Sequence, residues 1–168
     1  MNTTKTLILF IVLITLTSFG EKVETNSSLD FKAEENAINN LLDNIIISFE
    51  KQDAATLVGI LSNEVIVLGS APEQIFNKEQ ISTAWTQVLE QTSLLLNPVG
   101  ERQIRIASDG FSASAIEQFT MPDAYPNIVF RNAFHLVKEN KEWKVLCWNS
   151  ACIMSDEDLL RVSTLLSK

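Results

Sequence analysis

The sequence is poor in the residues from which many metal and catalytic sites are built. It has one histidine, His135, which excludes a histidine-based metal cluster, and no Cys/His/Asp spacing suggests a metal site. Its five glycines form no glycine-rich phosphate loop, and no elbow motif marks a Ser/His/acid triad. We therefore expect neither a metal nor a cofactor.

Positive charge and cysteine are also scarce. Thirteen Lys and Arg face 21 Asp and Glu, giving a formal net charge of −8, so the chain repels phosphate backbones and nucleic acid is not an expected partner. The two cysteines, Cys147 and Cys152, are an odd number of positions apart on one predicted strand. Their side chains should point to opposite faces, too far apart for a disulfide.

One long hydrophobic run is present, at residues 6–19, and it follows a short, positively charged start. Ser18 and Gly20 are small residues at the positions expected before a cleavage point, which is typical of a secretory signal peptide cut after Gly20. The alternative is an uncleaved anchor, but the run is shorter than the roughly 20 residues that span a bilayer. We expect an exported protein, periplasmic or secreted, with no membrane attachment after cleavage.

The mature chain is long enough for one domain. We divide it into a signal peptide at 1–20, a flexible leader at 21–29, a folded domain at 30–154 and a short C-terminal helix at 155–168. Apolar residues at helical spacing, with capping residues before them, predict helices at 30–52, 53–62 and 77–91. Alternating residues predict strands at 64–68, 103–107 and 111–121.

The segment 130–154 is the strongest pattern, because two β-branched and aromatic runs flank a charged break. We predict a hairpin with Asn140-Lys141 as its two-residue loop. Four pairs then face each other on one side: Lys138 with Trp143, Leu136 with Val145, Phe134 with Cys147, and Asn132 with Asn149. The opposite side includes Arg131, His135, Leu146 and Trp148. Neither row is polar, so we expect both to be covered.

Helices that precede consecutive strands indicate an α+β fold. The segments 68–85 and 136–151, with Gly69, Pro72, Trp143 and Lys144 at matching positions, resemble SnoaL-like domains of the nuclear transport factor 2-like superfamily. The resemblance implies a cone, in which a strongly bent antiparallel sheet packs on the N-terminal helices. The sheet face with Arg131, His135, Leu146 and Trp148 would then be covered by the same face of a second subunit, forming a homodimer.

The resemblance places the row with Asn132 inside the cone, where an apolar pocket with a few polar groups is expected. The predicted ligand-binding residues are Asn132, Asn149, Phe134 and Cys147, with Trp85 and Tyr125 at the mouth. The facing amides could hold a carbonyl or hydroxyl, or could bond each other. Many such domains carry His-x-His where this chain has Cys147 and Asn149, so chemistry based on that pair is not expected.

Glu117 is the one candidate catalytic residue, because it shares its row with small and apolar side chains and could act as a general base or acid. Three hypotheses follow. The first is binding of a small, largely apolar molecule. The second is an isomerase, dehydratase or cyclase that uses Glu117 as its base, and the third is a structural dimeric module.

Overall fold

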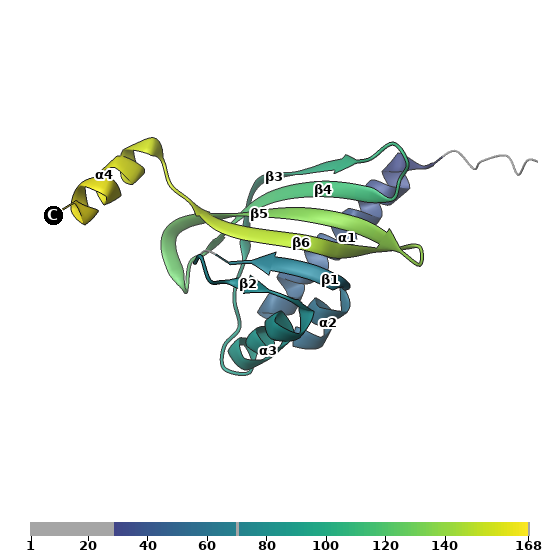
Figure 1. Ribbon diagram of the computed structural model, residues 1–168, viewed down its shortest axis with the longest axis horizontal. Helices are drawn as coiled ribbons and strands as arrows, with labels where there is room; N and C mark the ends of the chain where they lie inside the picture. Colours follow the sequence, from purple (N-terminus) through teal and green to yellow (C-terminus); the bar gives the residue numbers. More distant parts are fainter. Residues whose placement is uncertain (1–28, 70, 168) are drawn as a thin grey trace, which may run out of the picture.

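The computed structural model describes residues 29–69 and 71–167, so the predicted signal peptide lies outside the described residues. Helices precede most of the strands along the chain (Figure 1). In order, the elements are α1 (Phe31–Glu50), α2 (Ala54–Gly59), β1 (Leu61–Leu68), β2 (Ile75–Phe76), α3 (Lys78–Leu89), β3 (Asn97–Ile106), β4 (Ser112–Met121), β5 (Tyr125–Glu139), β6 (Glu142–Ile153) and α4 (Asp156–Leu166).

The helices begin where short polar side chains can accept hydrogen bonds from unpaired backbone N–H groups. Asp30 caps α1, and Asp53 caps α2 by accepting from the backbone and the hydroxyl of Thr56. These bonds from Thr56 hold the pKa of Asp53 below its ordinary value. Asn77 and Gln80 form a reciprocal capping box at the start of α3, as their spacing predicted.

The strands form one curved, unclosed sheet in the order β2-β1-β6-β5-β4-β3. All neighbours pair antiparallel except β1 and β6, which are parallel. The α+β cone predicted from the sequence is therefore confirmed. The sequence pattern missed the two-residue edge strand β2 and the parallel pairing of β1.

Helices α1, α2 and α3 cover one face of the sheet, which we call the inner face, and leave the other, outer face bare (Figure 1). The predicted apolar stripe of α1 is buried, and the inner rows of the strands complete the core. On the outer face, Ile66 is 50% exposed and Ile116 41% exposed. The helices therefore cover only one of the two faces of the sheet.

The hairpin of β5 and β6 turns at Asn140 and Lys141, both with positive φ, as predicted. Leu136 faces Val145, but His135 faces Cys147, so Leu146 is an extra residue, a β-bulge. Because successive strand side chains alternate faces, this one residue moves the rest of β6 to the opposite face.

The bulge corrects the predicted register beyond Val145. Phe134 faces Trp148 rather than Cys147, and Asn132 faces Ser150 rather than Asn149. Trp148, predicted on the outer face, is only 4% exposed and lies on the inner face.

Helix α4 lies apart from the rest of the molecule, beyond the end of β6 (Figure 1). Ser155 caps it, but none of its residues is buried. Its leucines are largely exposed, from 54% at Leu159 to 82% at Leu166. Within the described residues, no helix is both long and apolar enough to cross a membrane.

Candidate functional site

A hollow of about 190 Å³ lies between the inner face of the sheet and the ends of α1 and α3. We call it the inner hollow. Its wall is almost entirely apolar, and the described residues that line it include no charged side chain. They are Phe49, Val67, Leu68, Gly69, Phe76, Ile81, Trp85, Leu94, Leu96, Phe119, Met121, Asn132, Trp148 and Ser150.

Asn132 is the polar residue at the buried end of this wall and is fully covered. Its side-chain oxygen accepts a hydrogen bond from the indole nitrogen of Trp148 at 3.0 Å, and its amide nitrogen donates to Glu117 Oε1 at 3.1 Å. Because an indole N–H only donates and a carboxylate only accepts, the two neighbours fix the orientation of the amide. Asn132 therefore positions the Trp148 ring in the wall.

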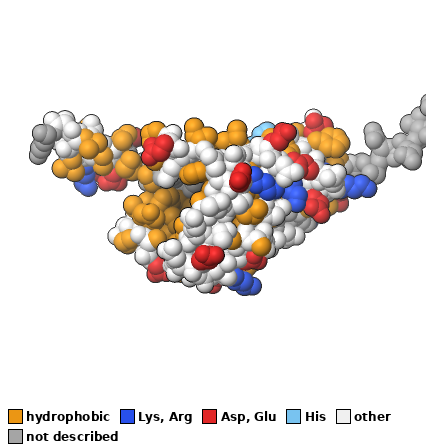
Figure 2. Space-filling view, turned by 60° about the horizontal axis from the view of Figure 1, so that its bottom comes forward, with side chains coloured by type: hydrophobic (Ala, Val, Ile, Leu, Met, Phe, Trp, Pro, Cys, Tyr) orange, Lys and Arg blue, Asp and Glu red, His pale blue; other side chains and the backbone are white. Residues whose placement is uncertain are grey.

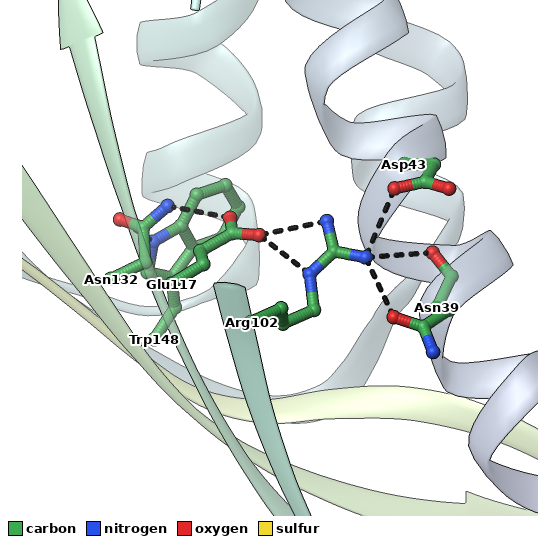
Figure 3. Close-up of polar contacts among 6 residues, drawn as sticks. All are labelled: Asn39, Asp43, Arg102, Glu117, Asn132 and Trp148. Carbon is green, nitrogen blue, oxygen red and sulfur yellow. Dashed lines mark hydrogen bonds and ion pairs between the residues drawn. The ribbon is translucent and has the colours of Figure 1, made fainter. Parts of the chain in front are cut away.

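Glu117 is 7% exposed and lies behind Asn132, not in the wall of the inner hollow. Its second oxygen, Oε2, accepts from Nε of Arg102 and lies 2.9 Å from Nη2 of the same guanidinium (Figure 3). Both carboxylate oxygens of Glu117 are thus engaged, one by an amide and one by a forked charged contact.

Arg102 extends the network to helix α1. Its Nη1 donates to the side-chain oxygen of Asn39 at 3.0 Å, to the Asn39 carbonyl at 3.3 Å and to Asp43 Oδ1 at 3.0 Å (Figure 3). Asp43 is exposed, whereas Arg102 is mostly buried. One chain of polar contacts therefore connects α1, β3, β4, β5 and β6, ending at Trp148.

Aromatic rings build the apolar part of the wall. The centroids of Trp85 and Trp148 are 5.2 Å apart, and Phe49 meets both rings edge-on at 5.8 and 6.2 Å. Phe134 packs on Trp148 from the other side, at 5.0 Å, and is buried outside the hollow. These separations are those of favourable aromatic pairs, so the wall is a rigid surface.

A second hollow, of about 360 Å³, adjoins the first. We call it the outer hollow, a name that does not refer to the outer face of the sheet. Gly69, Met121 and Ser150 line both, so the two spaces share a wall. The other residues of the outer hollow are Gln74, Tyr125, Ile128, Phe130 and Cys152. Figure 2 shows a recessed area of hydrophobic side chains on the side of the body next to α4.

The predicted site residues fall into three groups. Asn132 and Trp85 line the inner hollow, and Tyr125 lines the outer one. Phe134 and Glu117 lie directly behind the inner wall. The prediction that Cys147 and Asn149 face into the cone is wrong, because the bulge places them on the outer face, opposite His135 and Ala133.

Sequence reasoning missed Arg102. The predicted strand began at residue 103, whereas β3 begins at Asn97. Arg102, Ile104 and Ile106 are the half-buried members of one alternating row, so extending the pattern one step back would have placed Arg102 on the same face as Ile104. No sequence signal marks the bulge that moves Trp148 inward.

A separate polar cluster ties α1 to the hairpin tip, and we call it the tip cluster. Glu34 accepts a hydrogen bond from the Trp143 indole at 2.8 Å and pairs with Lys138, whose ammonium lies 5.0 Å from the Trp143 ring centre. The hydrogen bond from Lys138 is the main cause that lowers the pKa of Glu34, with Trp143 adding to it against the opposing effect of burial. The cluster borders an open groove of about 560 Å³.

Within residues 29–69 and 71–167, no three His, Cys, Asp or Glu side chains come together as a possible metal site. The polar groups at the site are amides, the hydroxyls of Tyr125 and Ser150 and one ion pair.

Solved structures share this architecture at low sequence identity. A protein of unknown function from Pseudomonas putida, described as nuclear transport factor 2-like, has a TM-score of 0.63 at 13% identity and covers 76% of this chain and 92% of its own. An uncharacterised protein with a cystatin-like fold from Caulobacter vibrioides has a TM-score of 0.63 at 16% identity, covering 81% and 99%. These likenesses define the fold class as nuclear transport factor 2-like.

A family model for SnoaL-like domains matches residues 38–154. The chain therefore belongs to the SnoaL-like family, as the resemblance in the sequence implied. No curated protein matches it. Because the fold hosts unrelated activities, function has to be argued from the site.

Proposed function

We propose that this domain binds a small, largely apolar molecule in the inner hollow. The observation that carries the proposal is a preformed apolar space walled by rigid aromatic rings and lacking a charged side chain among its described residues. An engineered apolar cavity of about 150 Å³ is enough to bind benzene, so 190 Å³ accommodates a ring or a short chain.

The polar network supports binding by holding the wall. Asn132 is fully buried, so its amide fixes the Trp148 indole instead of offering accessible surface. Ser150, which is half-buried and lines both hollows, is the hydroxyl available to a bound molecule. Arg102 and Glu117 act one step further back, by orienting Asn132.

Catalysis with Glu117 as general base stays a prediction. A base has to come within hydrogen-bond reach of the proton that it removes, directly or through one water. Glu117 does not line the inner hollow, and Asn132 and Arg102 occupy its two oxygens. The geometry therefore favours binding, with Glu117 as a positioning residue.

The test is titration with N-phenyl-1-naphthylamine, an uncharged apolar fluorophore. We expect saturable binding of one molecule per chain, weakened at least tenfold by Trp85→Ala, because that ring forms part of the wall. The matched control is Phe111→Ala, an exposed aromatic residue outside both hollows. An equal loss of probe affinity in both variants, or the absence of saturable binding to the unmutated protein, would overturn the proposal.

We also propose that the outer face of the sheet pairs with the same face of a second copy. Its support is the exposure of Ile66 and Ile116 together with Arg131 and His135 on this face. Ile116→Glu should then reduce the molar mass measured by light scattering to that of one chain. Export of the mature chain is likewise a proposal, supported by the apolar run at 6–19.

A further inference from the structure

We propose that the natural ligand is an elongated, uncharged molecule with one hydrocarbon chain, such as a fatty alcohol, ester or amide. Its apolar tail occupies the inner hollow and its neutral polar head lies in the outer hollow. This inference rests on the proposed function and adds to it the shape and the charge of the ligand.

The elongated shape follows from two adjacent hollows that have lining residues in common. The inner hollow, about 190 Å³, is smaller than the roughly 300–1,000 Å³ of typical small-molecule sites. The outer hollow adds about 360 Å³ and meets the inner one along Gly69, Met121 and Ser150. A molecule that fills both has to be longer than it is wide.

The polarity of the two walls determines which end of the ligand lies in which hollow. Apart from Asn132, which is covered, the wall of the inner hollow is apolar up to Ser150 at the joint. The outer hollow carries a neutral hydrogen-bonding set, the amide of Gln74 and the hydroxyls of Tyr125 and Ser150. An apolar tail therefore fits inside, and a hydroxyl or carbonyl head fits outside.

The absence of charged side chains from both walls favours an uncharged head. No Asp, Glu, Lys or Arg is among the described residues lining either hollow, although the chain is rich in such residues. The nearest buried ion pair, Glu117 with Arg102, is closed on itself behind Asn132. An ionised carboxylate or ammonium in these hollows would find no charged partner among the lining residues, so both walls favour a neutral head.

The experiment measures displacement of N-phenyl-1-naphthylamine at pH 7.5 by 1-octanol, octanoate and octylammonium, and by 1-butanol and benzene. We expect 1-octanol to displace the probe at a concentration at least tenfold below that of either ion and at least tenfold below that of 1-butanol. Benzene, which fits the inner hollow alone, should also displace it.

A charge introduced in the outer hollow separates head recognition from general water solubility. Ile128→Lys adds an ammonium at a position that is 37% exposed and should narrow the preference for 1-octanol over octanoate at least fivefold. Phe111→Lys adds the same charge at an exposed position outside both hollows and should leave that preference unchanged.

The outcomes separate this inference from the proposed function. If neither benzene nor any alcohol displaces the probe, the binding function itself fails. If benzene displaces it but 1-octanol does so no better than 1-butanol, the inner hollow binds alone and the elongated ligand is wrong. The uncharged head is wrong if octanoate displaces the probe as well as 1-octanol does, or if Ile128→Lys and Phe111→Lys change the preference for 1-octanol over octanoate equally.

Discussion

The space between the helices and the sheet differs at its two ends. At the hairpin tip, Glu34, Lys138 and Trp143 join helix and sheet through charged and polar contacts. At the other end, aromatic and aliphatic side chains surround the inner hollow, and no described charged residue lines it. Polar pairing at one end fixes how α1 sits on the sheet, which allows the other end to remain apolar and partly empty.

The network of Arg102 and Glu117 lies between these ends. It buries a carboxylate next to an apolar wall, which is tolerated because both of its oxygens have partners. The comparison therefore predicts that changes at the tip cluster affect stability alone, changes at the hollow affect binding, and changes in the network affect both.

The largest effect is expected for Glu117→Ala. Removing one partner of a buried ion pair leaves Nε and Nη2 of Arg102 and the amide nitrogen of Asn132 without the Glu117 acceptor, and such changes typically cost about 3 kcal/mol or more. We expect a lower urea midpoint and weaker binding of N-phenyl-1-naphthylamine. Asp43→Ala, which removes the exposed partner of the same Arg102, should cost less than about 1 kcal/mol. Similar losses of unfolding free energy in Glu117→Ala and Asp43→Ala would contradict the importance of the buried pair.

The same substitution at the two ends sharpens the comparison. Trp143→Phe removes an indole hydrogen bond to charged Glu34, and such bonds contribute about 1.5–3 kcal/mol. We expect Trp143→Phe to lose this amount of stability and to bind the probe as tightly as the unmutated protein. Trp148→Phe removes a hydrogen bond to the neutral Asn132, typically about 1 kcal/mol, but should weaken probe binding because Trp148 lines the hollow. If Trp143→Phe weakens probe binding as much as Trp148→Phe does, the two ends are not independent.

The pH dependence of stability tests the tip cluster by itself. Lys138 lowers the folded pKa of Glu34 below its ordinary value of 4.5, so the ionised carboxylate stabilises the fold. This contribution is complete above pH 4.5 and is lost as the pH falls through the lower, folded pKa. Wild type should therefore be more stable than Glu34→Gln at pH 7, and the difference should shrink at pH 3. Urea unfolding at both pH values measures it, and a difference that grows on acidification would contradict the assignment.

The sequence predicted those parts of the fold that depend on local patterns. The stripe from Ile38 to Phe49, the caps at Asp53 and Asn77 and the hairpin loop at Asn140 each follow from residues that lie close together in the sequence. The inner row of β4, with Glu117 in it, followed from simple alternation.

The site was only partly predictable, because it depends on one irregularity. The bulge at Leu146 exchanges Cys147 and Asn149 for Trp148 and Ser150 on the inner face. Both faces of β6 carry apolar residues, so the alternation that normally fixes a register gives no warning of the shift. Arg102 was missed for a different reason, since its partners Glu117 and Asp43 lie 15 and 59 residues away.

The smallest effect is expected outside both ends, at helix α4. Deletion of residues 155–168 removes a helix that buries none of its side chains, so the free energy of unfolding should change by less than about 0.5 kcal/mol. Probe binding should also persist, because no residue of α4 lines either hollow. Urea unfolding and probe titration of the truncated chain measure both. A clear loss of stability would mean that the exposed leucines of α4 pack on another surface in solution, and a loss of binding alone would place that surface at the outer hollow.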